Sequence, residues 1–308
     1  MERRKFLQHG ALAGIGSLTF GAAAANASHA DSTLPEKGKP FNLDYAPHAG
    51  MFKNSAGDSF LDQIQFMYDQ GFRSLEDNGM MNRSVEEQEK VSKLMSKLGM
   101  RMGVFVIDAG DNWKVSLATG KQEFKDRFVD VCNKAVEVAK RVNAKWMTVV
   151  PGYFERNLPI GVQTGNVIDA LRLGSDILAK HNLTMVLEPL SDNPDLFLRT
   201  ADQTYMICRA VNSPACKILY DIYHMQRNTG QLIPNMDWCW SEIAYIQIGD
   251  NPGRKEPTSG EINYKNIFKY LHKKGFKGVL GMEHGNAFPG KEGEVSLIKA
   301  YRESDSFL

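Results

Sequence analysis

Residues 243–264 read IAYIQIGDNPGRKEPTSGEINY, a sequence that begins as an apolar strand and returns to helical patterning at Tyr264. The strand ends where glycine and proline cluster at 249–253, because neither a strand nor a helix accommodates that composition. Gln247 lies inside the apolar run, although a polar amide is unfavourable to bury without a partner. A strand that ends in a polar side chain and continues through a loop into a helix is typical of a parallel α/β fold.

Three further apolar runs end with an acidic residue just before a loop: Glu188 in MVLEPL, Asp221 in ILYDIYH and Glu283 in VLGMEHG. Four strands that each deliver one oxygen ligand to the same end of a sheet predict a metal site. Carboxylates that close together raise each other's pKa unless a cation joins them. Oxygen ligands favour Mg²⁺ or Mn²⁺ over Zn²⁺. Taken singly, each residue is more typical of a structural, hydrogen-bonded carboxylate.

The apolar runs are continuous rather than alternating, which is typical of strands buried on both faces of a parallel sheet. Eight such runs alternate with helical patterns, which predicts a single (β/α)8 TIM barrel over residues 41–308. A doubly wound open sheet is the alternative, but no G-x-G-x-x-G motif supports a nucleotide-binding version. The expected strands are 41–45, 72–75, 102–107, 145–150, 184–187, 216–220, 243–248 and 278–282, and the expected helices are 60–70, 84–98, 122–142, 164–181, 201–211, 235–242, 264–274 and a terminal segment.

Residues 1–30 resemble a twin-arginine signal peptide: Arg3 and Arg4 precede an apolar stretch, and small-residue cleavage motifs end at Ala27 and Ala30. An uncleaved membrane anchor is the alternative, for which the apolar stretch is short and rich in glycine. Residues 31–40 are expected to be a linker. We therefore expect export by the twin-arginine route to a periplasmic or extracytoplasmic location, with no membrane span left after cleavage.

Charge and cysteine content narrow the classes of partner. The chain has 308 residues with a net charge of +1 and no basic block, so binding to nucleic acid is not indicated. The cysteines have no C-x-x-C spacing, which argues against a zinc ribbon or a redox motif. Buried free thiols are the favoured interpretation, and a homo-oligomer is left open. The four cysteines are Cys132, Cys208, Cys216 and Cys239.

The segment IQIGDNPGRKEPTSGEINY resembles the signature of the hydroxypyruvate isomerase family, within the xylose-isomerase-like TIM barrels. The spacings of 33, 26 and 36 residues between Glu188, Asp221, Gln247 and Glu283 also resemble those of the ketose 3-epimerases. The resemblance covers roughly residues 41–300, although GMEHG departs from it with His284 in place of an aromatic residue. It implies a metal on those four residues, with Glu188 and Glu283 also the acid/base pair, and pocket positions for His224, Arg254, Glu76 and His48.

The resemblance also implies a reaction. A divalent metal ion, with no organic cofactor, would hold a small α-hydroxycarbonyl substrate while a glutamate moves a proton through an enediolate. Hydroxypyruvate would then give 2-hydroxy-3-oxopropanoate. Arg254 would suit a substrate carboxylate because its guanidinium binds in a bidentate fork. Glu256 and Glu261 are more typical of solvated or loop-pinning charges.

Three other functions stay open at this point. One is a sugar isomerase or ketose 3-epimerase that acts on a larger carbohydrate or keto-acid, which needs a longer pocket. Another is a sugar- or metal-binding barrel without catalysis, against which the intact set of four ligands argues. The third is a DNA-repair endonuclease of the same superfamily, which would need a His-rich multi-metal site and a basic face.

Overall fold

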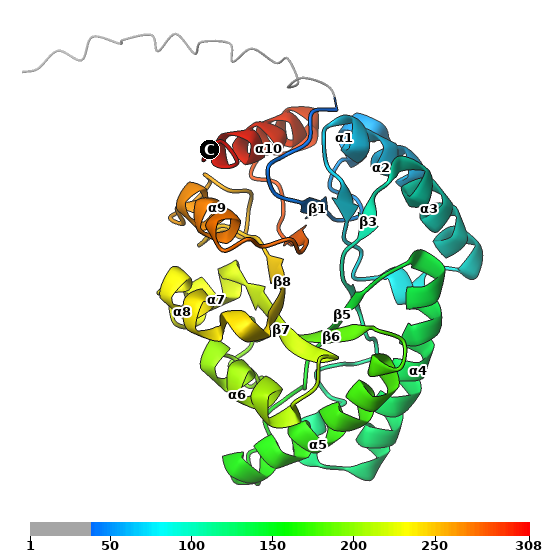
Figure 1. Cartoon of the computed structure of the whole chain (residues 1–308), viewed down its shortest axis with the longest axis vertical. Helices are drawn as coiled ribbons and strands as arrows, with labels where there is room; N and C mark the ends of the chain where they lie inside the picture. The colour runs from blue at the N-terminus through cyan, green and yellow to red at the C-terminus, as the bar shows by residue number, and fades with distance from the viewer. Residues whose placement is uncertain (1–37) are drawn as a thin grey trace, which may run out of the picture. The chain divides into compact units, whose positions relative to one another are not determined.

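The apolar runs of the sequence form parallel strands, and helices surround them (Figure 1). This computed structural model describes residues 38–308, so the predicted signal peptide at 1–30 and most of the predicted linker lie outside the described residues. Seven strands pair in the order β1-β9-β8-β7-β6-β5-β4, and β2 pairs with β3. The predicted TIM barrel is therefore confirmed. The strands are β1 (Tyr45–Pro47), β2 (Ser74–Leu75), β3 (Arg101–Met102), β4 (Phe105–Val106), β5 (Trp146–Val149), β6 (Thr184–Leu187), β7 (Cys216–Asp221), β8 (Ile243–Gln247) and β9 (Leu280–Met282).

Backbone hydrogen bonds close the barrel between the two sheets. The amide of Glu76 donates to the carbonyl of Pro47 over 3.0 Å, which joins the end of β2 to β1, and the amide of Val106 donates to the carbonyl of Asn78 over 3.2 Å, which joins β4 to the segment after β2. The third expected strand, 102–107, is divided into β3 and β4 at Gly103. A Cβ atom at Gly103 would lie 2.4 Å from the hydroxyl of Tyr245, so only glycine fits where the chain changes partners.

The helices follow the predicted pattern closely. The expected helices at 122–142 and 201–211 have the bounds of α4 and α6, and Ser84 forms the predicted capping box with Glu87. The expected helix at 164–181 begins earlier, at Ile160. The helices are α1 (Lys53–Ala56), α2 (Phe60–Asp69), α3 (Val85–Leu98), α4 (Gln122–Val142), α5 (Ile160–Ala179), α6 (Ala201–Val211), α7 (Ile222–Asn228), α8 (Leu232–Cys239), α9 (Tyr264–Lys273) and α10 (Gly290–Ser304).

Two local predictions were wrong for tertiary reasons. The first strand begins at Tyr45 rather than Phe41, because the carboxylate of Asp305 accepts the backbone N–H groups of Asn42 and Leu43 that a strand would have used. Helix α7 was not predicted at all. It follows β7 directly, because Asp221 both ends the strand and caps the helix by accepting the N–H of His224.

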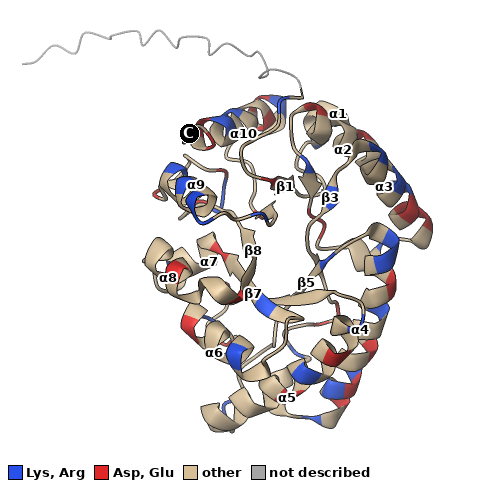
Figure 2. Cartoon of the chain, viewed as in Figure 1, with Lys and Arg blue, Asp and Glu red and all other residues tan. Residues whose placement is uncertain are grey.

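The surface carries charges of both signs. Lysine and arginine are interspersed with aspartate and glutamate on the outer helices α3, α4 and α5 (Figure 2). The four cysteines are buried free thiols, as predicted. Within residues 38–308, none of the helices combines the length and the hydropathy that crossing a membrane requires.

Candidate active site

The four predicted oxygen ligands all lie at the carboxyl ends of neighbouring strands. Asp221 and Gln247 are the last residues of β7 and β8, and Glu188 and Glu283 follow β6 and β9 directly. These strands are adjacent in the sheet, and Gln247 pairs in register with Asp221 on one side and Gly281 on the other. The carboxyl end of the strands is where TIM barrels assemble their active sites. The local patterns therefore located this end of the barrel correctly.

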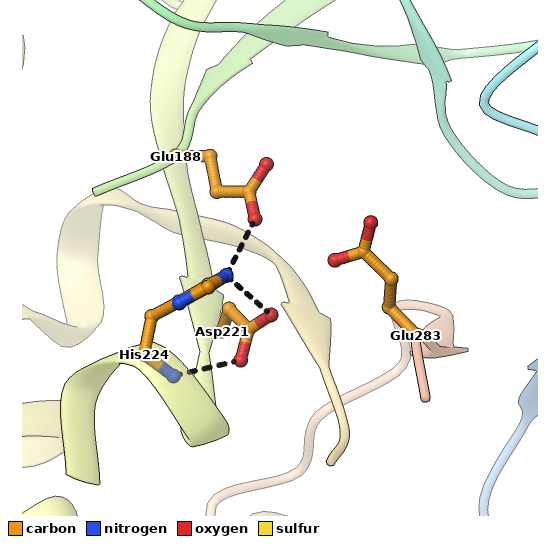
Figure 3. Close-up of side chains that lie close together, drawn as sticks. All are labelled: Glu188, Asp221, His224 and Glu283. Atoms are coloured by element: carbon orange, nitrogen blue, oxygen red, sulfur yellow. Dashed lines mark hydrogen bonds and ion pairs between the residues drawn. The ribbon is translucent and has the colours of Figure 1, made fainter. Parts of the chain in front are cut away.

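A cluster of three carboxylates and one imidazole forms at this end (Figure 3). Glu188, Asp221, His224 and Glu283 each offer one ligand atom, and these atoms lie within 4.8 Å of one another. Nε2 of His224 is 3.7 Å from Oε1 of Glu188 and 3.7 Å from Oδ2 of Asp221. His224, expected to contact substrate, thus lies among the predicted metal ligands. It reaches them from the first turn of α7, three residues after Asp221.

The pKa values of Glu188, Glu283 and His224 are shifted from their usual ranges. Burial raises the pKa of Glu188 well above its usual range, and the charges of Glu283 and Asp221 raise it further. Burial also raises the pKa of Glu283 to about 7, although Arg254 opposes this shift. The pKa of His224 is lowered, mainly by burial. A cation bound here would stabilise the ionised form of these buried carboxylates, and a neutral imidazole would not repel it.

Among the described residues, Arg254 brings a positive charge to this cluster. Its Nη2 atom donates to Oε2 of Glu283 over 2.8 Å, lies 3.1 Å from Nε2 of His224, and is 3.5 Å from Oδ2 of Asp221. Its guanidinium also lies 5.1 Å from the centre of the Tyr223 ring. Arg254 therefore reaches the site as predicted, but it already contacts acidic groups there.

The loop that carries Arg254 is folded around one buried carboxylate. Asp250 accepts the backbone N–H groups of Asn251, Gly260 and Ile262 over 2.8–3.0 Å. The middle of the loop is also held to the segment after β9, since Glu256 accepts the N–H of Ala287 over 2.7 Å. The loop-pinning role expected for Glu256 is confirmed, and Glu261 similarly accepts hydrogen bonds from Asn251 and Gln226.

Gln247 and Glu76 form a buried pair beside the cluster. Nε2 of Gln247 donates to Oε1 of Glu76 over 2.9 Å, whereas Oε1 of Gln247 is buried without a hydrogen-bond partner among the described residues. Oε1 of Glu188 is buried and unpartnered in the same sense. Buried acceptors normally find a donor. Two orphaned oxygens at the end of the barrel therefore fit a bound cation.

The two remaining predicted pocket residues are held by the protein itself. Glu76 has no exposed surface, and the hydroxyl of Tyr245 donates to its second oxygen over 2.8 Å. His48 follows β1, and its ring nitrogens lie 2.9 Å and 3.1 Å from the carbonyl oxygens of Ala49 and His284. Contact of either residue with substrate stays a prediction. The ring of His284 stacks on Tyr301, and Nε2 of His284 lies within hydrogen-bond distance of the Tyr301 hydroxyl, at 2.7 Å.

Three site residues were missed by the sequence reasoning. Asn78 donates to Oε1 of Glu283 over 2.8 Å, and the hydroxyl of Ser191 lies 2.8 Å from Nδ1 of His224. Asp192 is 3.7 Å from Nε2 of His224 and 3.9 Å from Nη1 of Arg254. All three follow strand ends within five residues. Their polar side chains in the loops after β2 and β6 could have indicated site residues. Polar loop residues are common on any protein surface, however, so this signal is not specific.

Comparison with known proteins agrees with the geometry. The hydroxypyruvate isomerase of Escherichia coli (strain K12) is 29% identical over 178 residues, which are 57% of this chain and 67% of that protein. The 2-oxo-tetronate isomerase of Pectobacterium atrosepticum is 27% identical, with 73% and 86% covered. A crystal structure titled AP endonuclease, family 2, from Brucella melitensis shares the fold, with a TM-score of 0.74, 22% identity, and 84% and 99% covered.

The relatives named hydroxypyruvate isomerase and 2-oxo-tetronate isomerase show that the chain is an isomerase. The family model described as "Xylose isomerase-like TIM barrel" matches residues 64–303, which span β2 through most of α10 and include all four residues of the carboxylate and imidazole cluster. The chain belongs to the xylose isomerase-like TIM barrel family.

Proposed function

We propose that this protein is a metal-dependent isomerase that converts hydroxypyruvate to 2-hydroxy-3-oxopropanoate through an enediolate. The observation that carries the proposal is the convergence of Glu188, Asp221, His224 and Glu283, with ligand atoms within 4.8 Å of one another at the carboxyl ends of the strands. The relatives named hydroxypyruvate isomerase support the choice of substrate.

The donor set of this site suits a hard divalent cation. Glu188, Asp221, Gln247 and Glu283 would hold Mg²⁺ or Mn²⁺. Nε2 of His224 lies 3.7 Å from both Glu188 and Asp221, so a substrate oxygen bound by His224 would lie beside the ion. The unpartnered oxygens of Glu188 and Gln247 support this assignment. When bound, such an ion polarises the substrate carbonyl and stabilises negative charge on the enediolate oxygens.

Glu188 and Glu283 are the proposed acid and base. The reaction removes a proton from C3 of hydroxypyruvate and returns one to C2, while the hydroxyl proton passes from the C3 oxygen to the C2 oxygen. One glutamate takes the carbon-bound proton, and the same or the opposite glutamate returns it.

Arg254 and His224 are the proposed groups that orient the substrate. The guanidinium of Arg254 borders the cluster and matches a substrate carboxylate in shape and charge. Nη2 of Arg254 already donates to Glu283, so a bound substrate carboxylate would share the guanidinium with that glutamate. The substrate would therefore be held beside Glu283, one of the two proposed proton carriers.

A four-carbon 2-oxo acid is the second candidate substrate. The 2-oxo-tetronate isomerase relative is covered over 86% of its length, more than the 67% of the Escherichia coli hydroxypyruvate isomerase. The same proton transfer applies to either compound, because both are α-hydroxycarbonyl acids. The four-carbon acid differs from hydroxypyruvate in needing a pocket with more space beyond C3.

A proton-exchange assay tests the proposal. The protein is loaded with Mn²⁺ or Mg²⁺ and incubated in D₂O with hydroxypyruvate, 2-oxo-tetronate and a panel of neutral ketoses, followed by NMR. We expect metal-dependent uptake of deuterium beside the carbonyl, fastest for one of the two acids. Faster exchange on a neutral ketose would replace the substrate with a sugar, and no exchange on any compound would contradict enediolate chemistry.

We also propose that residues 1–30 direct export by the twin-arginine route to the periplasm. The adjacent Arg3 and Arg4 before an apolar, glycine-rich stretch support this proposal. Cell fractionation tests it: the protein is expected outside the cytoplasm, with a new N-terminus after Ala27 or Ala30. Replacement of both arginines by lysine is expected to retain it inside, and an unchanged distribution would contradict the route.

A further inference from the structure

A second buried polar cluster lies beside the carboxylate and imidazole cluster. It consists of Glu76, Tyr245 and Gln247, none of which exposes more than 1% of its surface. The carboxylate of Glu76 accepts one hydrogen bond on each oxygen, from the Tyr245 hydroxyl over 2.8 Å and from Nε2 of Gln247 over 2.9 Å. A buried carboxylate is unfavourable in a barrel interior, so this arrangement calls for a reason beyond packing.

The backbone around the cluster is shaped to admit it. A Cβ atom on Gly281 would lie 1.8 Å from Oε2 of Glu76, and one on Gly103 would lie 2.4 Å from the hydroxyl of Tyr245. Glycine at both positions leaves the space that the carboxylate and the phenol occupy. Five positions therefore build this group: Glu76 and Gly103 directly after β2 and β3, Tyr245 and Gln247 on β8, and Gly281 on β9.

The hydrogen bond to Glu76 decides which way the Gln247 amide faces. A side-chain amide has one donor end and one acceptor end. Because the NH₂ group of Gln247 donates to Glu76, its oxygen points elsewhere, and it has no hydrogen-bond partner among the described residues. Gln247 lies between Asp221 and Gly281 in the sheet register, beside the strands that carry the other proposed ligands.

We propose that Glu76 is a positioning residue that orients Gln247 so that the amide oxygen serves as a ligand to the divalent cation. The proposal rests on the metal-dependent function proposed above. It assigns Glu76 to the support of a ligand instead of direct contact with substrate. Residues that orient metal ligands in this way commonly contribute tenfold to a hundredfold to metal affinity.

Titration of the full chain with Mn²⁺, followed by the electron paramagnetic resonance of the free ion, tests the proposal without recourse to turnover. Glu76→Met removes the acceptor while keeping the volume and is expected to weaken Mn²⁺ binding by about 10- to 100-fold. Glu76→Gln keeps a carbonyl acceptor for Gln247 and is expected to bind within about threefold of the wild type. Circular dichroism checks that each variant is folded.

Tyr245→Phe is the matched control. It removes the other hydrogen bond to Glu76 and leaves the one that orients Gln247, so Mn²⁺ affinity is expected to stay within about threefold. Equal losses in Tyr245→Phe and Glu76→Met would indicate general loosening and overturn the proposal. Should Glu76→Met not fold, Glu76→Asp withdraws the acceptor by one methylene group and is expected to weaken binding in the same direction.

The remaining outcomes separate this inference from the proposed function. Wild-type affinity in the folded Glu76→Met variant, with Mn²⁺-dependent exchange in the wild type, would overturn the positioning role and leave the isomerase proposal standing. A wild-type protein that binds no Mn²⁺ would overturn both the positioning role and the metal-dependent function, since Gln247 would then have no ion to bind.

Discussion

At the scale of single residues, the site depends on acidic groups that share one small volume. Burial disfavours the ionisation of Glu188 and Glu283, and the charge of nearby Asp221 disfavours it further. Arg254 offsets part of this repulsion through its contacts with Glu283 and Asp221. A site that is electrostatically unfavourable in the protein alone is suited to binding a cation.

Removing one of the proposed acid/base groups should abolish most of the activity. Glu283→Gln is nearly isosteric, but it cannot carry a proton to or from carbon and loses a charge toward the metal. We expect kcat to fall by about 10²- to 10⁴-fold and Mn²⁺ affinity to fall with it. Steady-state kinetics and metal analysis measure both effects. Glu89→Gln, on the exposed face of α3, is the control, and full activity in Glu283→Gln would refute the assignment.

The raised pKa of Glu283 also predicts how metal-free protein responds to pH. Its pKa of about 7 lies above the unfolded value of 4.5, so the folded state binds this proton more tightly. The stabilisation is fully present below pH 4.5 and is lost as the pH rises through about 7. Urea unfolding at pH 5 and pH 8 should show a fall of up to about 3 kcal/mol from this group. Glu283→Gln should reduce that fall, and an identical fall in the variant would contradict the shift.

At the scale of elements, the loop after β8 positions Arg254. Its fold depends on hydrogen bonds from backbone N–H groups to Asp250 and on the close approach of Gly260 to the chain at Asn251. The strand supplies Gln247 and the loop supplies Arg254, so one β-strand and its loop carry both a proposed metal ligand and a proposed substrate-binding group. The precision of the site thus rests on a segment without regular secondary structure.

Gly260→Ala tests that dependence. A Cβ atom at this position would lie 2.1 Å from the carbonyl oxygen of Asn251, so the loop has to shift and carry Arg254 with it. We expect KM for hydroxypyruvate to rise about tenfold or more, because a displaced guanidinium loses a charge-assisted contact. Gly253→Ala is the control on the same loop, since its Cβ would meet the protein only at 3.4 Å. Equal kinetics in the two variants would argue against positioning by the loop.

At the scale of the whole molecule, the proposed metal binding would be coupled to folding through the barrel. The proposed ligands come from β6, β7, β8 and β9, which pair side by side in the sheet. The ion would therefore join four strands that are separated by long stretches of sequence. Any ligand that binds the folded state and not the unfolded chain stabilises the fold.

Metal loading should therefore raise the melting temperature. At a Mn²⁺ concentration of about 100 times Kd, we expect a gain of about 2.7 kcal/mol in the free energy of unfolding. The gain should be larger at pH 8 than at pH 6, because the ion competes with protons for Glu188 and Glu283. Differential scanning calorimetry with and without EDTA measures it. An unchanged melting temperature in wild type would contradict a resident metal, and Glu283→Gln should show a smaller shift.

The sequence by itself determined the barrel and the end of it that carries the chemistry. Both follow from local patterns: continuous apolar runs predict buried parallel strands, and Glu188, Asp221 and Glu283 mark where such strands stop. The helix α4 and the capping box at Ser84 were predictable for the same reason, because periodicity and caps act over a few residues.

Only the tertiary structure decided which side chains meet. Helix α7 brings His224 into the carboxylate cluster, and the amide of Gln247 turns toward Glu76, which lies 171 residues away in sequence. The start of β1 likewise depends on Asp305 at the other end of the chain. These contacts join strands and helices that are distant in sequence, and hydrogen bonding and close packing across the barrel select them. No local pattern encodes that choice, because each residue's own neighbours in sequence are compatible with several partners.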